Sequence, residues 1–353
     1  MGLHFTVVGV TAIASASLLL AGCSSSSTEA GEASESAATS AASESATPTP
    51  TGPCELAPDT KVTDLTFEEL QQYQLNNGEA IPTLDEFLKF ANEKKVGVLP
   101  EIKTFAAAEG EPKPVPSDAQ FAEFADLVNQ YPDITEVLIG SFDETTLKYF
   151  ADNEPDWPRV WFRGIGGSVG DPFAPPTVAE MNSRAPSADA LGVLNVLYFQ
   201  GTFPQNGQQY DVPAEFAAAN IPVYIWYNVA TGGDSAEDGA EFAGLPSPGW
   251  NSIASKNPKD VKWIATDFTK EYSAWAESAP AEAQPAPQMV AHRGGGEESV
   301  SENSMQAFAE AVDNGAAVLE TDVQWTKPTD SDPNGVPVLM HDDTINRTAA
   351  CPS

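Results

Sequence analysis

Basic residues are scarce in this chain of 353 residues. It contains 17 Lys and Arg against 51 Asp and Glu, which gives a formal net charge of −34 at pH 7. Because nucleic acids are bound through clusters of cationic side chains, this composition argues against a nucleic-acid-binding protein. It also places a repulsive field in front of anionic ligands, although an acidic exterior is most often only a soluble, self-repelling surface. The hydrophobic content of 41% is typical of a globular protein.

Long apolar runs and cysteines are also scarce. The apolar run at residues 5–20 is too short for a comfortable membrane span. It ends in Leu20-Ala21-Gly22-Cys23, and this stretch resembles a bacterial lipoprotein signal. The resemblance implies that residues 1–22 are a signal peptide and that Cys23 is lipidated. It also implies an exported protein, held by its lipid at the outer face of the bacterial cytoplasmic membrane.

Large apolar side chains are absent from residues 24–53, which contain only Ser, Ala, Thr, Glu, Gly and Pro. Such a segment cannot bury enough apolar surface to offset the entropy lost on ordering. We therefore expect residues 23–53 to form a disordered tether with a root-mean-square reach of roughly 30 Å. The folded body is expected to begin at residue 54.

Short apolar segments alternate with amphipathic segments through this body. The predicted strands span residues 96–103, 136–142, 159–165, 192–199, 221–228, 261–266, 288–292 and 317–323. The predicted helices include residues 83–95, 117–131, 143–152 and 302–314, with Asp118, Asp143 and Ser301 as expected N-caps. This alternation predicts an α/β fold, a (β/α)8 TIM barrel, with an open doubly wound sheet as the alternative. Residues 276–287 offer no obvious packing side chains and are expected to be a linker.

Two carboxylates are expected to face one spot in the last predicted strand. Residues i and i+2 of a strand point to the same side, so Glu320 and Asp322 lie next to each other. Since two carboxylates without a counter-charge repel, a Mg²⁺ or Ca²⁺ ion between them is an economical solution. A further carboxylate, that of Glu101, stands with a cationic side chain, that of Lys103, at the end of the first predicted strand.

Histidine is rare, and its positions are informative. The chain contains 3 His, namely His4, His292 and His341, and His4 leaves with the expected signal peptide. His292, followed by Arg293, and His341 both fall at the ends of apolar strand-like segments, where barrel enzymes place catalytic groups. Taken singly, each of these signals also has an ordinary structural explanation, such as a hydrogen-bonded core histidine or a solvated ion pair.

Together the motifs resemble the glycerophosphodiester phosphodiesterase family. The segments AHRGGG, SENSMQAF, ETDVQWT and VPVLMHDDTINRT, within residues 291–348, resemble the opening third of that family. The segments VTDLTFEEL, IPTLDEFL, PEIK, GSFD and ATDF, within residues 62–267, resemble its remainder. The order is reversed, which implies a circularly permuted barrel. Residues 54–275 then supply strands 3–8 in family order, residues 276–287 join the family's original termini, and residues 288–353 supply strands 1 and 2.

The resemblance implies the metal-dependent hydrolysis of glycerophosphodiesters to glycerol 3-phosphate and an alcohol. It assigns catalytic roles to His292, His341 and Arg293, with the two histidines as general acid and base. It assigns a divalent metal, Ca²⁺ or Mg²⁺, to Glu320, Asp322 and Glu101. The implied substrate-binding residues are Lys103, Arg293, Glu302 and Trp226.

The implied permutation also concerns Cys54 and Cys351. It brings the new chain ends together on the catalytic face, close enough for a disulfide that replaces the lost peptide connection. Two free thiols are the alternative. Thiol counting on unreduced protein distinguishes the two.

Three alternative interpretations stay open. One is a barrel phosphodiesterase of the phosphoinositide phospholipase or sphingomyelinase type, which acts on intact lipids. Another is a non-catalytic binding lipoprotein, and a third is a dimer in which truncated barrels complete each other. The main interpretation expects a monomer whose partners are a small glycerophosphodiester substrate and, through the lipid anchor, the membrane.

Overall fold

The computed structural model describes residues 54–57, 59–104, 115–164, 174–198, 201–202, 209–227, 232–242, 244–256, 260–295 and 301–352. The expected signal peptide, the expected lipidation site Cys23 and the expected tether lie outside these ranges. Within the described ranges, no helix has both the length and the apolar character needed to cross a membrane.

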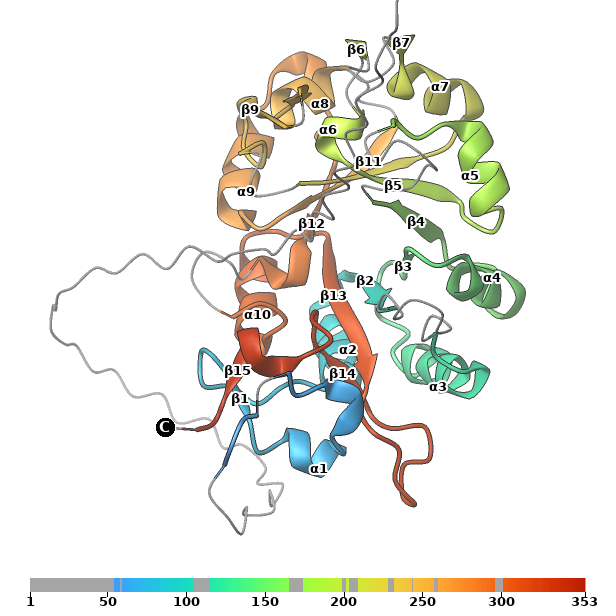
Figure 1. The fold of residues 1–353 in the computed structure, drawn as a ribbon. Coiled ribbons are helices and arrows are strands. Elements are labelled where there is room, and N and C mark those ends of the chain that lie inside the picture. The colour runs from blue at the N-terminus through green and yellow to red at the C-terminus, as the bar shows by residue number, and fades with distance from the viewer. Residues whose placement is uncertain are drawn as a thin grey trace, which may run out of the picture. The chain divides into compact units, whose positions relative to one another are not determined.

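Eight parallel strands close into a barrel (Figure 1). They are β2 (Gly97–Ile102), β3 (Ile139–Ser141), β4 (Arg159–Arg163), β5 (Ala190–Leu194), β8 (Val223–Trp226), β11 (Val261–Thr266), β12 (Gln288–Ala291) and β13 (Val318–Trp325). Each strand pairs with the next one in this order, and β13 pairs with β2 to close the ring. The predicted TIM barrel is confirmed. The alternative open sheet is wrong, because an open sheet keeps two unpaired edges.

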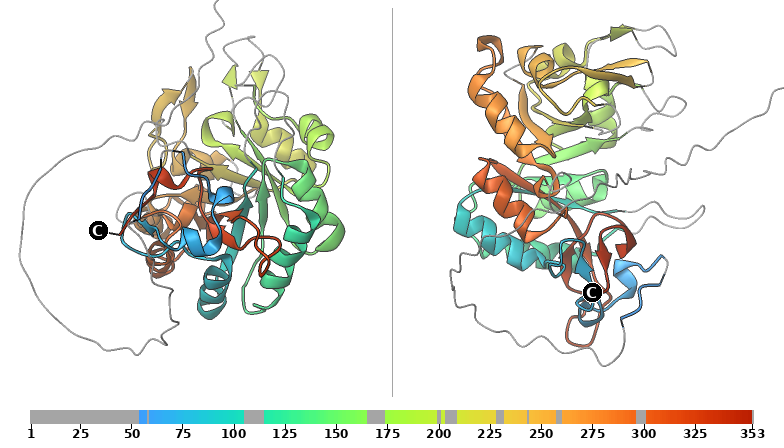
Figure 2. Two further views of the ribbon diagram at one scale, coloured as in Figure 1. Left: turned by 60° about the horizontal axis from the view of Figure 1, so that its bottom comes forward. Right: turned by 90° about the vertical axis from the view of Figure 1, so that its left-hand side faces the viewer.

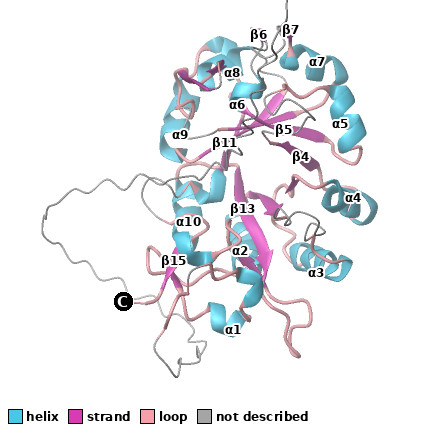
Figure 3. Cartoon of the chain, viewed as in Figure 1, coloured by secondary structure: helices cyan, strands magenta, loops and turns pink. Residues whose placement is uncertain are grey.

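Helices surround the strands on the outside (Figure 3). They are α2 (Leu84–Lys94), α3 (Asp118–Asn129), α4 (Glu144–Asn153), α5 (Val178–Arg184), α7 (Val212–Ala219), α8 (Trp250–Lys256), α9 (Thr269–Ser278) and α10 (Met305–Asp313). Several begin with a side-chain cap. Thr83, for example, accepts a hydrogen bond from the backbone N–H of Glu86, whose carboxylate in turn accepts one from the backbone of Thr83.

Shorter elements fill the connections. They are η1 (Val62–Asp64), α1 (Phe67–Leu70), β1 (Gln74–Leu75), α6 (Asn195–Tyr198), β6 (Gly201–Thr202), β7 (Gln209–Tyr210), β9 (Gly239–Phe242), β10 (Leu245–Ser247), η3 (Ala281–Ala283), η4 (His292–Gly294), β14 (Pro337–Leu339), η5 (Ile345–Arg347) and β15 (Ala349–Ala350). Of these, β14 extends the sheet beyond β13 in the antiparallel direction.

Large side chains fill the inside of the barrel. Phe162 lies between Gly140 and Gly192, where an added Cβ would come within 2.6 and 2.4 Å of the Phe162 ring. The interior cluster also includes Leu99, Leu138, Val160, Tyr224, Trp263 and Val290. The barrel is therefore a packed core, and chemistry is confined to its ends.

The strand predicted at residues 192–199 is wrong in its second half. The strand β5 ends at Leu194, and α6 follows directly. Asn195, Val196, Leu197 and Tyr198 are all buried, so a buried helical turn gives the same unbroken apolar pattern as a strand. Phe199, the last residue of this predicted strand, lies outside the described residues, as do Ile165 and Asn228, which end two other predicted strands.

Two of the three predicted N-caps are wrong. Asp143 caps α4, as predicted, by accepting a hydrogen bond from the N–H of Thr145. Ser117 rather than Asp118 caps α3, and Ser304 rather than Ser301 caps α10. The helix α10 begins three residues later than the predicted start because Asn303 adopts a left-handed conformation, with φ of 54°.

The segment predicted as a linker, residues 276–287, contributes to packing. The helix α9 runs to Ser278, and η3 follows within the segment. Ala283 is completely buried. An isolated alanine is too small to indicate burial in the sequence, but the Ala283 side chain packs in the main hydrophobic cluster.

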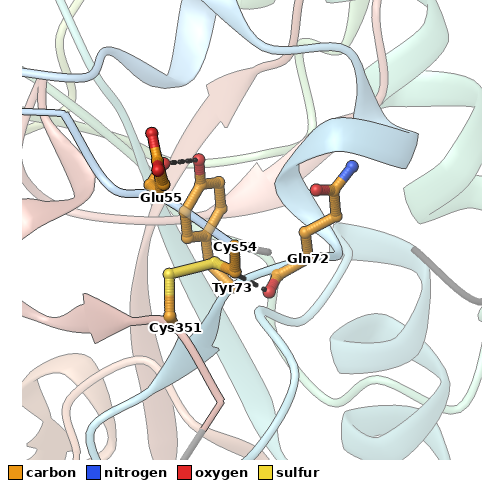
Figure 4. Close-up of a disulfide and its surroundings, with 5 residues drawn as sticks. All are labelled: Cys54, Glu55, Gln72, Tyr73 and Cys351. Atoms are coloured by element: carbon orange, nitrogen blue, oxygen red, sulfur yellow. Dashed lines mark hydrogen bonds between the residues drawn. A yellow bond between two sulfur atoms is a disulfide. The ribbon is translucent and has the colours of Figure 1, made fainter. Parts of the chain in front are cut away.

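The two ends of the described body fold together, and both views of Figure 2 show the blue and red segments side by side. The strand β1 pairs with β15 in an antiparallel ladder, and Cys54 forms a disulfide with Cys351, with 5.7 Å between their Cα atoms. Figure 4 shows this bond beside Tyr73, whose hydroxyl donates to the carbonyl of Glu55. Both cysteines pack against a separate apolar cluster, which includes Val62, Leu70, Val338 and Ile345.

Candidate active site

Three carboxylates converge on the paired strands β2 and β13. Asp322 stands directly opposite Glu101, and Glu320 lies two residues before Asp322 on the same side of β13. One carboxylate oxygen from each of Glu101, Glu320 and Asp322 lies within 4.8 Å of the other two. Glu320 and Asp322 are only 2% and 1% exposed, so their charges require compensation from nearby groups or from an ion.

The electrostatics of this cluster fit a cation. Burial and the negative charge of Asp322 raise the pKa of Glu320 to about 8. Burial alone would raise the pKa of Asp322 as well, but the positive charges of Lys103 and Arg293 lower it. Among the described residues, Oδ1 of Asp322 accepts no hydrogen bond. Carboxylate oxygens are the ligands that Ca²⁺ and Mg²⁺ prefer, so these three residues could hold either ion.

His292 follows β12 directly and is paired with an aspartate. Its Nδ1 atom lies 2.7 Å from Oδ1 of Asp267, which follows β11. Burial lowers the pKa of His292, but the negative charge of Asp267 outweighs this effect and raises the pKa to about 9. The same pairing keeps the pKa of Asp267 below its usual value, although burial acts in the opposite direction.

Asp267 is held in turn by a second aspartate. The Asp234 carboxyl accepts hydrogen bonds from the hydroxyl of Thr266, at 2.9 Å, and from the backbone N–H of Asp267, at 3.2 Å. Burial and the charge of Asp267 raise the pKa of Asp234 to about 7. Asp267 follows β11, which pairs with β12 on the edge opposite to β13.

His341 follows β14 and has its own aspartate partner. Its Nδ1 atom lies 2.6 Å from Oδ1 of Asp342. Hydrogen bonds from His341 and Arg347 lower the pKa of Asp342, although burial alone would raise it. Arg347 also binds Glu302 with two hydrogen bonds of 2.7 and 2.8 Å. A chain of contacts therefore runs from His341 through Asp342 and Arg347 to Glu302.

Arg293 stands between the carboxylate cluster and Glu302. Its backbone adopts φ of 51°, and its N–H donates to Oε2 of Glu320 at 2.7 Å. The guanidinium group lies 3.2 Å from both carboxylate oxygens of Glu302 and 3.3 Å from Oδ2 of Asp322. A left-handed non-glycine residue at this point is strained, and its conformation aims the guanidinium toward the site.

Lys103 is the second cation at the cluster. Its Nζ atom lies 2.8 Å from Oε1 of Glu101 and 3.3 Å from Oδ1 of Asp322. Burial lowers the pKa of Lys103, but the two carboxylates more than compensate and raise it. The structure thus brings together all the predicted catalytic and metal-binding residues, together with Lys103 and Glu302.

Trp226, also predicted to bind substrate, forms no hydrogen bond with this group among the described residues. It ends β8, two strands away from β12, and packs against the barrel interior. Its indole nitrogen has no hydrogen-bond partner among the described residues.

Four residues of the site carried no predicted role. They are Asp267, Asn303, Asp342 and Arg347. The side chain of Asn303 donates to Oδ2 of Asp322 at 2.8 Å and accepts from the hydroxyl of Thr321, and so it orients the central carboxylate. Each of the four belongs to one of the motifs quoted from the sequence. The sequence alone, however, does not show which side chain such a polar residue contacts.

The chain is similar in part to known phosphodiesterases. The model of the glycerophosphoryl diester phosphodiesterase family matches residues 292–352. Glycerophosphodiester phosphodiesterase 1 of Rattus norvegicus is 44% identical over 59 residues, and that of Homo sapiens is 42% identical over 59 residues. In both cases the match covers 17% of this chain and 16% of the relative, so the chain spans under a fifth of the length of the curated relatives it matches.

A solved structure is also similar. A crystal structure of a glycerophosphodiester phosphodiesterase from Parabacteroides distasonis aligns with a TM-score of 0.39 and 17% sequence identity. The alignment covers 60% of this chain and 71% of that chain.

Proposed function

We propose that the chain hydrolyses glycerophosphodiesters to glycerol 3-phosphate and an alcohol. The observation that carries the proposal is the convergence of three carboxylates with two aspartate-paired histidines at one end of a closed barrel. The match of residues 292–352 to a phosphodiesterase family supports the reaction class, because this segment contains both histidines and two of the carboxylates. Cleavage of a phosphodiester requires an acid, a base and neutralisation of the phosphate charge, and the site offers each of them.

The proposed metal ligands are Glu101, Glu320 and Asp322, with Ca²⁺ or Mg²⁺ as the ion. When bound, the ion supplies a Lewis acid that polarises the phosphoryl group. Arg293 and Lys103 are the cationic side chains beside these carboxylates, and we assign them to the non-bridging oxygens of the phosphate. Glu302 binds Arg293, and Arg347 in turn binds Glu302.

The proposal also assigns the two histidines. His292, whose pKa is raised to about 9, carries a proton at neutral pH and is suited to protonate the leaving alkoxide. His341 then acts as the base, with Asp342 holding its Nδ1 proton so that Nε2 is free to accept one. Asp267 and Asp342 are positioning residues, because each contacts a histidine rather than the reacting atoms.

We further propose that residues 1–22 are a signal peptide, that Cys23 is lipidated, and that the barrel is circularly permuted and held outside the cytoplasmic membrane. The Cys54–Cys351 disulfide supports an exported protein, because disulfides persist in oxidising compartments. Since the described strands of one chain close the barrel without help, we propose a monomer rather than truncated barrels that complete each other.

The test is the release of glycerol 3-phosphate from glycerophosphocholine by the purified protein. We expect release in the presence of Ca²⁺ or Mg²⁺, its loss in EDTA, and its recovery when the ion is restored. Lysophospholipids serve as the second substrate, and a preference for them would favour the alternative lipid phosphodiesterase. Absence of product with every ion and substrate would support the non-catalytic binding lipoprotein.

A further inference from the structure

A buried glutamine, Gln324, is the last residue on the face of β13 that carries Glu320 and Asp322. Residues i, i+2 and i+4 of a strand point to the same side, so the Gln324 side chain follows the two carboxylates toward the end of the strand. It is only 3% exposed. The proposed reaction uses both carboxylates but gives this amide no role.

The amide of Gln324 contacts the chain on both sides of His341. Its Nε2 atom donates to the carbonyl of Met340 at 2.7 Å and to the carbonyl of Asp342 at 2.6 Å. The strand β14 ends one residue before Met340, whose N–H still donates to the carbonyl of Asp322 at 3.0 Å. The His341 segment, residues 340–342, therefore leaves the pairing with β13 at this point, and the glutamine holds it there.

The two carbonyls enclose the backbone of the proposed base. The Met340 carbonyl belongs to the peptide group before His341, and the Asp342 carbonyl belongs to the peptide group after Asp342. Between these two groups, the chain can turn only about the φ and ψ angles of His341 and Asp342. One nitrogen bound to both carbonyls restricts these angles. The contact of 2.6 Å between Nδ1 of His341 and Oδ1 of Asp342 depends on them, because both side chains project from this backbone.

The amide oxygen of Gln324 indicates that packing does not explain a glutamine at this position. Among the described residues, its Oε1 atom accepts no hydrogen bond, although the side chain is buried. A buried acceptor without a donor is costly, and an apolar side chain of the same length would avoid that cost. The contribution of the amide therefore lies in the two donations from Nε2, and both end on the His341 segment.

We propose that Gln324 is a positioning residue, which holds the backbone of His341 and Asp342 and thereby fixes the imidazole for its role as the base. The reaction itself rests on the proposed function, whereas the effect of Gln324 on the imidazole does not require turnover. Arg347 binds the carboxylate of Asp342, and Gln324 binds its carbonyl. The arginine therefore holds the partner of the histidine, and the glutamine holds the backbone of both.

The first experiment observes the histidines without turnover, by NMR of the whole protein in EDTA at neutral pH. Gln324→Met keeps the length of the side chain and removes both donated hydrogen bonds. We expect the C2–H resonance of His341 to shift or broaden and that of His292 to stay in place, with the two alanine variants identifying the resonances. Circular dichroism checks the fold, and Gln324→Asn, whose amide is one methylene short, replaces a methionine variant that does not fold. An unchanged His341 resonance in the folded variant would overturn the proposal.

The second experiment compares the kinetics of Gln324→Met with those of a matched control, Gln130→Met. Gln130 is exposed at the end of α3, and its Nε2 atom also donates to a backbone carbonyl, that of Asp126, at 3.1 Å. We expect kcat for glycerophosphocholine to fall about tenfold in Gln324→Met, as loss of a supporting contact commonly causes, and to stay unchanged in the control. The KM should not change, because the described contacts of Gln324 include neither Arg293 nor Lys103. A kcat like that of the parent, or a loss confined to KM, would contradict the proposal.

A double-mutant cycle then tests whether Gln324 acts through His341. Once the imidazole is absent, its orientation no longer matters, so Gln324→Met should lower kcat by less than about twofold in the His341→Ala background. A merely structural role of the glutamine would instead lower kcat about tenfold in both backgrounds, and that result would overturn the proposal.

The outcomes separate this inference from the proposed function. Hydrolysis by the parent, together with an unchanged His341 resonance and a kcat like that of the parent in Gln324→Met, would defeat the positioning role alone. A shifted His341 resonance without hydrolysis by the parent would retain the effect of Gln324 on the imidazole and defeat the proposed phosphodiesterase.

Discussion

The Nδ1 atom of His292 lies 2.7 Å from Oδ1 of Asp267, and this pair joins the end of β12 to the end of β11. Asp267 thereby fixes both the orientation of the imidazole ring and its protonation. The histidine is the donor in this bond, so its Nε2 atom faces away from Asp267.

Replacement of Asp267 by Asn is expected to lower the pKa of His292. The negative charge of Asp267 raises that pKa to about 9, and without it the burial of the imidazole favours the neutral form. Titration of the histidine C2–H resonances by NMR in EDTA measures the change. The control is Glu277→Gln, which removes an exposed carboxylate of α9. A His292 pKa that is the same in the variant and in the parent would contradict the electrostatic role of Asp267.

The same pair is expected to make stability depend on pH in the alkaline range. The folded pKa of His292, about 9, lies above its ordinary value of 6.5, so the pairing stabilises the fold fully below pH 6.5. This contribution is lost as the pH rises through about 9. Urea unfolding at several pH values should therefore show a difference between the parent and Asp267→Asn at pH 6 that becomes smaller by pH 10. A difference that stays constant with pH would show that the pairing is not ionic.

Removal of either histidine is expected to abolish turnover and to leave the fold intact. We expect His292→Ala and His341→Ala each to lower kcat for glycerophosphocholine by about 10²–10⁴, the usual contribution of acid–base catalysis. Circular dichroism and the unfolding midpoint report whether each variant is folded, and Glu277→Gln is the matched control. Rates close to those of the parent in both variants would defeat the assignment.

Arg347 is expected to act through its fork-shaped guanidinium group. It binds Glu302 with two hydrogen bonds and also binds Asp342, the partner of His341. A lysine keeps the charge but cannot bind both carboxylates in this way. We expect Arg347→Lys to lower kcat about tenfold, as loss of a supporting contact commonly does. The control is Arg184→Lys on α5, where an exposed arginine pairs with Glu180 of the same helix. A larger effect in the control would argue against the contact chain to His341.

The disulfide is expected to stabilise the fold. It connects residues separated by 297 positions, and closure of a long loop restricts the unfolded chain. The double variant Cys54→Ser, Cys351→Ser is expected to lose about 2–4 kcal/mol of unfolding free energy, measured by urea unfolding without reductant. Thiol counting on the unreduced, denatured parent checks the bond directly. Two reactive thiols from this pair would contradict it.

The carboxylate pair of the site could be predicted from the sequence because it depends on the local geometry of one strand. Glu320 and Asp322 share a face for the same reason that any residues i and i+2 of a strand do. The position of Glu101 opposite Asp322 depends instead on the pairing register of β13 with β2, which is fixed by barrel closure. A strand-end motif could indicate that Glu101 belongs to the site, but not which carboxylate it faces.

The supporting residues could not be predicted, because their contacts cross between elements. Asp267 and His292 each follow one of two neighbouring strands, and Arg347 binds Glu302 across 45 positions in the sequence. Nothing in the sequence around Arg347 distinguishes it from a solvated arginine at the surface. The buried helix α6 was missed for a related reason, since burial on all sides removes the periodicity that separates helix from strand.

The pairing of β13 with β2 has a consequence for how the protein is made. Synthesis runs from the N-terminus, so the strand that carries Glu101 is made long before the strand that carries Glu320 and Asp322. The carboxylate cluster therefore cannot assemble on a partly synthesised chain, and an incomplete barrel has neither histidine in place. The candidate active site forms only when β13 pairs with β12 on one side and with β2 on the other. The site is therefore the last part of the molecule to become complete.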